Sequence, residues 1–173
     1  MDVYIPGDNQ EKQLEVLAEL VEASKKLGIN ISIFGGYGLD GLYGSLTRDH
    51  HDIDVLVSSE QRNDLVQVAL DMGFYEHKES WGKKKYKRKD LGDVFYVEVV
   101  TPEKLQKFME VGEQELFPAG DAAHLGNTVF KTPTLKGHKY VHEVQTKVAK
   151  EKGWEEYRHK ENKEKLFDIL SNA

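Results

Sequence analysis

The stretch SIFGGYGLDGLYGSLTRDHHDIDVLV, residues 32–57, decides the fold. It contains the pattern G-x-G-x-x-G at Gly36, Gly38 and Gly41, which is typical of dinucleotide-binding turns. It ends in two aspartates, Asp52 and Asp54, within a β-branched segment that predicts a strand. Two hypotheses compete: either the glycines bind a dinucleotide, or the aspartates hold metal ions.

The position of the aspartates along their strand separates these hypotheses. A dinucleotide-binding unit joins parallel strands, and its acidic residue lies near the C-terminal end of the second strand. Asp52 and Asp54 instead begin the strand at 52–57, so parallel pairing would place them at the opposite end of the sheet from the glycines. Antiparallel pairing would bring the glycine turn and both carboxylates together, as a site for a nucleoside triphosphate and Mg²⁺ requires. Because alternate strand residues share a face, the two carboxylates point together, and we favour the metal-binding interpretation.

The rest of the chain alternates between helical and strand patterns. Hydrophobic spacing predicts helices over residues 11–29, 37–46, 58–74, 101–111, 135–154 and 158–170. Strands are predicted over 29–34, 52–57 and twice within 83–100, where residues 90–93 form a turn. We interpret the basic run at 75–89 as one charged edge strand, because lysines discourage association between sheets. Residues 112–134 are predicted to be an irregular, functional loop.

Composition limits the class of protein. A length of 173 residues predicts one compact domain, and the absence of cysteine excludes disulfides, cysteine-ligated zinc and thiol chemistry. The N-terminus lacks a signal-peptide pattern and no apolar run could span a membrane, so we expect a cytoplasmic protein without a membrane partner.

The net charge of −6 argues against general nucleic-acid binding and suits a cationic small molecule. Solubility alone also explains a charge of this size. The oligomeric state is not readable from the sequence, which leaves a homodimer open.

The residues around the aspartates carry a family resemblance. Between Phe34 and Val57 the sequence resembles the polymerase-beta-like nucleotidyltransferase superfamily, and most nearly the aminoglycoside and lincosamide nucleotidylyltransferases. The matching residues are Gly35, Gly36, Tyr37, Asp40, Arg48, His50, Asp52 and Asp54. The resemblance implies an α+β fold with a small mixed, largely antiparallel sheet flanked by helices, and a C-terminal helical segment. It also implies a nucleotidyltransferase core at residues 1–112, with a loop and C-terminal helices at 113–173 completing the substrate cleft.

The same resemblance implies a catalytic and metal-binding set of three carboxylates. Asp52 and Asp54 would bind Mg²⁺, with two ions expected, and a third carboxylate on a neighbouring strand would complete the set. Glu98 in VFYVEVV is the best match, because an acid in an otherwise apolar strand requires an explanation, and it would also act as general base. The alternative is that Glu98 is an ion-pair partner for one of the many lysines. Asp93 is the alternative, although turn chemistry also explains its position.

Several residues are candidate nucleotide contacts. Gly35 and Gly36 would let the backbone approach the phosphates, and Arg48 matches phosphate oxygens bidentately unless it pairs with Asp49 or Asp40. Lys136, together with Lys139, would reach the β and γ phosphates unless both are exposed.

A zinc site formed by His50, His51 and Asp52 is less favoured, because consecutive side chains on an extended chain diverge.

We therefore predict an enzyme of antibiotic resistance that transfers a nucleoside monophosphate, AMP from ATP, to a hydroxyl of a small cationic molecule such as an aminoglycoside or a lincosamide. Glu113, Glu115 and Asp121 are acidic residues that would receive such an acceptor, although surface solvation explains them equally well. Two alternatives stay open: a toxin–antitoxin type nucleotidyltransferase that modifies a protein or tRNA, and a non-catalytic nucleotide-binding module.

Overall fold

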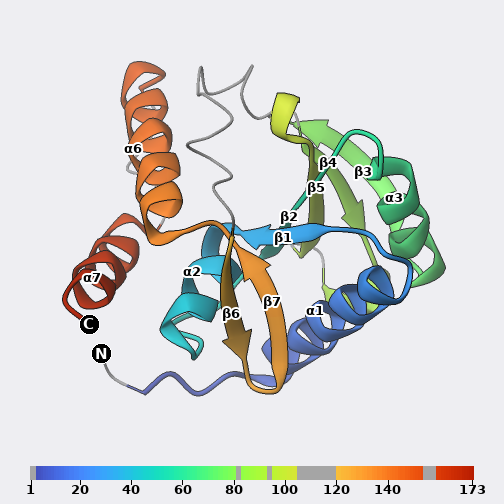
Figure 1. Ribbon diagram of the computed structural model, residues 1–173, viewed down its shortest axis with the longest axis horizontal. Coiled ribbons are helices and arrows are strands. Elements are labelled where there is room, and N and C mark those ends of the chain that lie inside the picture. The colour runs from blue at the N-terminus through green and yellow to red at the C-terminus, as the bar shows by residue number, and fades with distance from the viewer. Residues whose placement is uncertain (1–2, 81–82, 93–94, 105–119, 154–158) are drawn as a thin grey trace.

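A five-stranded sheet forms the centre of the computed structural model, which describes residues 3–80, 83–92, 95–104, 120–153 and 159–173 (Figure 1). Its strands, in spatial order, are β1 (Ile31–Phe34), β2 (Asp52–Val57), β5 (Tyr96–Val100), β4 (Lys83–Lys87) and β3 (Tyr75–Ser80). β2 pairs in parallel with β5, and the other three pairs are antiparallel. The predicted α+β fold with a mixed, largely antiparallel sheet is confirmed. The dinucleotide hypothesis is wrong, since it requires β1 and β2 to be parallel.

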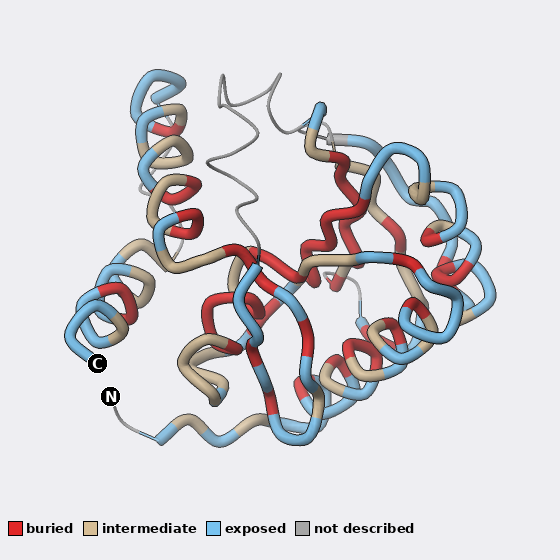
Figure 2. The backbone as a smooth tube through the Cα atoms, in the orientation of Figure 1, coloured by how far each residue is buried: buried red, intermediate tan, exposed pale blue. Residues whose placement is uncertain are grey.

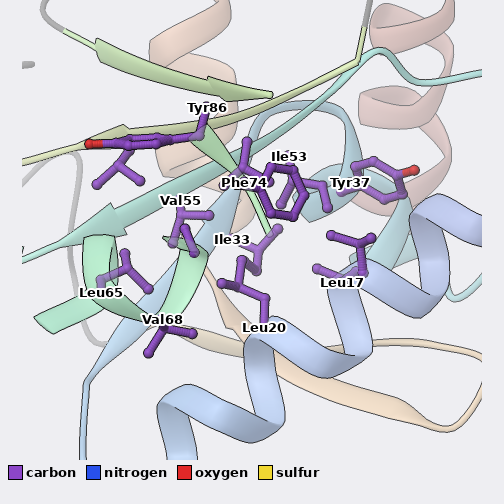
Figure 3. Close-up of a cluster of buried hydrophobic side chains, with 14 of the residues drawn as sticks. Leu17, Leu20, Ile33, Tyr37, Ile53, Val55, Leu65, Val68, Phe74 and Tyr86 are labelled. Atoms are coloured by element: carbon purple, nitrogen blue, oxygen red, sulfur yellow. The ribbon is translucent and has the colours of Figure 1, made fainter. Parts of the chain in front are cut away.

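Helices cover one face of the sheet with apolar side chains. The helices that lie wholly within the described residues are α1 (Asp8–Lys26), α2 (Gly35–Tyr43), α3 (Arg62–Asp71), α6 (Leu135–Glu151) and α7 (Lys160–Ser171), together with the 3₁₀ turn η1 (Lys89–Leu91). Leu17 and Leu20 of α1 and Leu65 of α3 join Ile53 and Val55 of β2 in the main core (Figure 3). Full burial of each such side chain stabilises the folded state by about 1.5–3 kcal/mol relative to leaving it exposed to water.

The opposite face of the sheet carries the polar residues of β2. Phe34, Leu56 and Val100 form a smaller cluster on this face together with Val141 of α6. Because Ile53 and Val55 enter the main core, the alternating Asp52 and Asp54 share the opposite face, as expected, and this face lies toward α6. Burial in Figure 2 is concentrated in the strands and along the inner sides of the helices. The aspartates therefore lie on the sheet face toward the C-terminal helices.

A hairpin replaces the predicted loop over part of residues 112–134. β6 (Asp121–Leu125) and β7 (Thr128–Thr132) pair antiparallel, and the side chains of Ala123, Leu125 and Phe130 enter the main core. The expectation of irregular structure is wrong for these residues. The two-residue turn at 126–127, with glycine at positive φ, is a recognised hairpin signal. The proposed boundary at residue 112 lies outside the described residues.

Three further expectations change in detail. The basic run at 75–89 forms two strands, β3 and β4, rather than one. β4 is not an edge strand, since it lies between β5 and β3, and its Tyr86 packs into the main core. α3 begins at Arg62 rather than at residue 58. Residues 102–104 are helical, and the remainder of the helix predicted at 101–111 lies outside the described residues. Among the described helices, none combines the length and the apolar character needed to cross a lipid bilayer.

Candidate active site

The glycine pair places the start of α2 against β2. Phe34, the last residue of β1, is paired with Asp54 of β2, so the next residue, Gly35, lies beside that carboxylate. A Cβ on Gly35 would lie 2.3 Å from Asp54 Oδ2, and the φ of +66° is one that L side chains rarely adopt. A Cβ on Gly36 would lie 2.5 Å from His50 Nδ1 and 2.7 Å from Arg48 Nη2. Both glycines are therefore required by close packing at the beginning of α2.

Three carboxylates converge on this position. β2 and β5 are parallel neighbours, and their register pairs Asp54 with Glu98 and Asp52 with Tyr96. One oxygen from each of Asp52, Asp54 and Glu98 lies within 4.8 Å of the others. Asp54 and Glu98 are buried, at 7% and 4% exposed. The structure thus brings together all three carboxylates singled out from the sequence, whereas Asp93 lies outside the described residues.

Burial sets the protonation of these carboxyl groups. Burial raises the pKa of Asp54 well above its ordinary value, against the opposing attraction of Lys83. Burial also raises the pKa of Asp52, and the negative charge of Glu98 adds to this effect. Burial alone would raise the pKa of Glu98. The positive charge of Lys83 and side-chain hydrogen bonds with Asp54 and Lys85 instead lower this pKa to about 2. Glu98 is therefore ionised at neutral pH, and Asp54 is the acid that holds a proton more readily.

Two lysines of β4 neutralise the cluster. The Lys83 Nζ lies 2.6 Å from Asp54 Oδ1 and 3.1 Å from Glu98 Oε2, and the Lys85 Nζ lies 2.9 Å from Glu98 Oε1. Both side chains are largely buried, at 15% and 20% exposed. Lys83 was missed in the sequence because it belongs to a run of basic residues. The alternation of β4 groups Lys83 with Lys85 and Lys87 but does not indicate which face they take.

A buried hydrogen-bond network supports the segment that leads into β2. His50 Nε2 donates to Asp40 Oδ2 at 2.7 Å, and the His50 backbone N–H donates to the side chain of Gln10 at 2.8 Å. Asp40 also accepts from the Thr47 backbone N–H at 2.9 Å and from its hydroxyl at 2.7 Å. Burial lowers the pKa of His50, so the ring is neutral, and it packs on Tyr37 with a centroid distance of 4.3 Å. Asp40 and His50 therefore hold the backbone that presents Asp52.

The favoured ligand set does not include histidine. Within the described part of the chain, the one cluster with metal-binding spacing consists of Asp52, Asp54 and Glu98. His50 uses its Nε2 on Asp40, and a zinc site with His51 finds no support.

A cavity of about 280 Å³ opens next to the carboxylates. β2 contributes Asp52 and Asp54 to its wall, and the start of α2 contributes Gly35 and Gly36. Arg48 also lines it, and its guanidinium donates to the Asp49 backbone carbonyl at 2.8 Å.

The far wall of the cavity comes from the C-terminal helices. His138, His142 and Gln145 of α6 and Lys163 and Phe167 of α7 line it. Burial lowers the pKa of His138 to about 3, and its Nε2 shares a hydrogen bond with Thr132 Oγ1 at 2.8 Å. This wall therefore combines apolar, neutral imidazole and cationic side chains.

The two lysines predicted at the start of α6 do not line this cavity. Lys136 is exposed, and Lys139 donates to Ser171 Oγ at 2.5 Å. Of the acids suggested for the acceptor, Asp121 is exposed on β6, and Glu113 and Glu115 lie outside the described residues.

Comparison with known proteins identifies both sequence and structural relatives. A family model described as aminoglycoside-2''-adenylyltransferase matches residues 16–103, slightly more than half of the chain, and this match includes all three carboxylates. No curated protein sequence matches the chain.

Solved structures match over nearly the whole chain. The crystal structure of ANT(2'')-Ia in complex with adenylyl-2''-tobramycin has a TM-score of 0.62 at 17% identity, covering 93% of this chain and 98% of that one. The lincomycin-bound lincosamide adenylyltransferase LnuA has a TM-score of 0.65 at 12% identity, covering 93% and 97%. An antigenic nucleotidyltransferase-like protein from Paracoccidioides brasiliensis has a TM-score of 0.57 at 15% identity, covering 96% and 77%. These structures share the nucleotidyltransferase fold.

Proposed function

We propose that this chain, which belongs to the aminoglycoside-2''-adenylyltransferase family, is a Mg²⁺-dependent enzyme that transfers AMP from ATP to a hydroxyl of an antibiotic. The observation that carries this proposal is the convergence of Asp52, Asp54 and Glu98 beside the start of α2, with both aspartates in the wall of a cavity. Binding of a nucleotide alone would not require three carboxylates within 4.8 Å of one another.

The donor set fits a hard divalent cation. Mg²⁺ prefers oxygen ligands, and each of the three carboxylates offers one oxygen to a common centre. The ammonium of Lys83, between Asp54 and Glu98, is evidence that these oxygens already stabilise positive charge. Asp52, Asp54 and Glu98 would hold the proposed two ions. When bound, Mg²⁺ would neutralise the triphosphate and stabilise the charge that develops on the attacked phosphoryl group.

The start of α2 is proposed to hold the phosphates. No described side chain caps this helix, so its first backbone N–H groups, at Gly35 and Gly36, remain for an anion. The Arg48 guanidinium lies next to Gly36, and a guanidinium matches phosphate oxygens bidentately. Lys163 of α7, which lines the same cavity, is a better candidate than the exposed Lys136 for the outer phosphates.

Glu98 is proposed to accept the proton of the attacking hydroxyl. In the reaction the acceptor oxygen forms a bond to the α-phosphorus, the bond to pyrophosphate breaks, and the hydroxyl proton passes to a base. Burial raises the pKa of Glu98, but the lysines lower it to about 2, so the carboxylate is ionised at neutral pH, as a general base must be. While both lysines contact its carboxylate, its basicity is low.

The acceptor is proposed to enter between the sheet and the C-terminal helices. The ANT(2'')-Ia structure holds adenylyl-2''-tobramycin and the LnuA structure holds lincomycin, so an aminoglycoside or a lincosamide is the proposed class. His142 and Phe167 supply the described wall on that side, in agreement with a role for residues 113–173 in completing the cleft. A cytoplasmic location, with ready access to ATP, is part of the proposal.

A mass-spectrometric screen tests the function. Purified protein is incubated with Mg²⁺, each of the four nucleoside triphosphates, and a panel containing tobramycin, lincomycin, tRNA and a protein extract. We expect one class of antibiotic to gain the mass of AMP, and EDTA to prevent the gain. A nucleotide gain on tRNA or protein alone would contradict the antibiotic proposal and favour a toxin-type activity.

A further inference from the structure

The ammonium of Lys83 lies between two of the three carboxylates, Asp54 and Glu98. Its Nζ bridges two strands, at 2.6 Å from Asp54 on β2 and 3.1 Å from Glu98 on β5. The Nζ also lies 5.1 Å from the ring centroid of Phe34, which favours a cation at this position. Lys83 therefore contacts residues of three neighbouring strands, including two of the three proposed metal ligands.

The neighbouring lysine shows that this placement is specific. Lys84 points to the other side of β4, where its Nζ lies 3.0 Å from Glu76 Oε1. The Lys84 side chain is 27% exposed and the Glu76 side chain is 54% exposed. Such an exposed pair is worth about 0–1 kcal/mol. Buried carboxylates, in contrast, require a compensating positive charge, since an unpaired buried charge is strongly destabilising. A partly exposed ion pair can explain Lys84 but does not explain Lys83.

We propose that Lys83 is a positioning residue that serves as the internal counter-cation of the metal site: it neutralises Asp54 and Glu98 while no metal is bound and leaves them when the metal enters. This inference rests on the proposed metal site of the enzyme. The ammonium of Lys83 at Asp54 Oδ1 and Glu98 Oε2 repels a divalent cation that approaches these carboxylates, so metal binding is favoured when Lys83 moves away. The free enzyme consequently binds metal weakly, and the metal enters together with the triphosphate, whose phosphates then offer Lys83 a new partner.

The flexible side chain of lysine suits this exchange. Lys83 also lines the cavity, so its ammonium can turn from the carboxylates toward the space proposed for the triphosphate. Its departure removes one of the two cations that contact Glu98 and leaves Lys85 on the other oxygen.

The test measures binding of Mn²⁺ alone to the purified full chain, by electron paramagnetic resonance of the free ion without nucleotide. Lys83→Met removes the charge and keeps much of the side-chain volume, and Lys83→Arg keeps a cation. Lys84→Met is the matched control, because it removes a charge and an ion pair from the adjacent residue on the opposite face of β4. Circular dichroism checks that each variant is folded.

We expect Lys83→Met to bind Mn²⁺ at least about 10-fold more tightly than wild type, equivalent to about 1.4 kcal/mol. Lys83→Arg and Lys84→Met should stay within about twofold of wild type, which is about 0.4 kcal/mol. Mn²⁺ should also raise the melting temperature of Lys83→Met more than that of wild type, and this second readout still applies when the variant is less stable without metal.

Unchanged or weaker Mn²⁺ binding by a folded Lys83→Met protein would overturn the inference, as would equal tightening in Lys84→Met. The outcome is separable from the proposed function. A protein that adenylylates no antibiotic but binds Mn²⁺ more tightly after Lys83→Met supports the inference alone, whereas an active enzyme without this change refutes it alone.

Discussion

Replacing Asp40 by alanine should destabilise the protein through the network that holds the segment before β2. The Asp40 carboxylate is 1% exposed and accepts three hydrogen bonds, from His50 Nε2 and from the backbone and hydroxyl of Thr47. Alanine leaves the His50 N–H and the Thr47 N–H without an acceptor. Each unsatisfied buried donor costs about 1–3 kcal/mol, and water can reach the half-buried Thr47, so we expect a loss of about 2–4 kcal/mol.

Asparagine separates hydrogen bonding from charge at the same position. Its carbonyl oxygen can accept from His50 and from the Thr47 backbone, while its NH₂ group donates to the Thr47 hydroxyl. Burial lowers the pKa of His50 and keeps its ring neutral, so no ion pair is lost. We therefore expect Asp40→Asn to cost about 1 kcal/mol, the difference between a charge-assisted and a neutral hydrogen bond.

Urea unfolding followed by circular dichroism measures both variants. For a chain of this length, the loss in Asp40→Ala corresponds to a fall in melting temperature of about 4–16 °C. A loss below about 0.5 kcal/mol would refute the proposed role of the network. Equal losses in the two variants would show that the charge of Asp40 matters and that His50 is protonated.

Two further predictions follow from the packing and protonation of the site. Gly36→Ala should destabilise the fold by about 1–3 kcal/mol and reduce nucleotide transfer, because its Cβ would lie 2.5 Å from His50 Nδ1; an unchanged melting temperature and transfer rate would contradict this close packing. His138 is neutral when folded, with a pKa that burial lowers to about 3, whereas the unfolded chain takes up a proton below about pH 6.5. The free energy of unfolding therefore falls as pH is lowered from 6.5 toward 3, and this group accounts for a loss of about 2 kcal/mol at pH 5. His138→Gln keeps a hydrogen-bond partner for Thr132 and should remove that part of the loss. An unchanged pH dependence of urea unfolding in the variant would contradict this prediction.

The local sequence predicted much of the site because its chemistry is carried by short-range patterns. The alternation in DIDVLV assigned Asp52 and Asp54 to one face, and their place at the start of the strand required an antiparallel β1. Glu98 was recognisable as an acid within an apolar strand. The pairing of Glu98 with Asp54 on β2 was not predictable in the same way, because the register of two parallel strands depends on long-range packing rather than on local sequence.

Long-range contacts explain what the sequence did not reveal. Lys83 lies in a run with many lysines, and a shift of one residue in the pairing of β4 would exchange the faces of Lys83 and Lys84. The strands of the β6–β7 hairpin are short, so each has too few buried apolar residues to predict a strand from the sequence. These strands are stabilised by packing against α2 and β1, which are distant in the sequence. Its glycine-containing turn was nevertheless a local signal.

Transfer of AMP by Asp54→Asn tests the central claim most directly. The substitution keeps the shape of the side chain beside Gly35 but removes the charge of a proposed metal ligand. Asp71→Asn, at an exposed acid near the end of α3, is the matched control. With Mg²⁺, ATP and the antibiotic found in the screen, we predict that Asp54→Asn lowers the rate by about two orders of magnitude or more, while Asp71→Asn retains the wild-type rate. A folded Asp54→Asn protein that transfers AMP at the wild-type rate would contradict the assignment of this carboxylate cluster as the catalytic metal site.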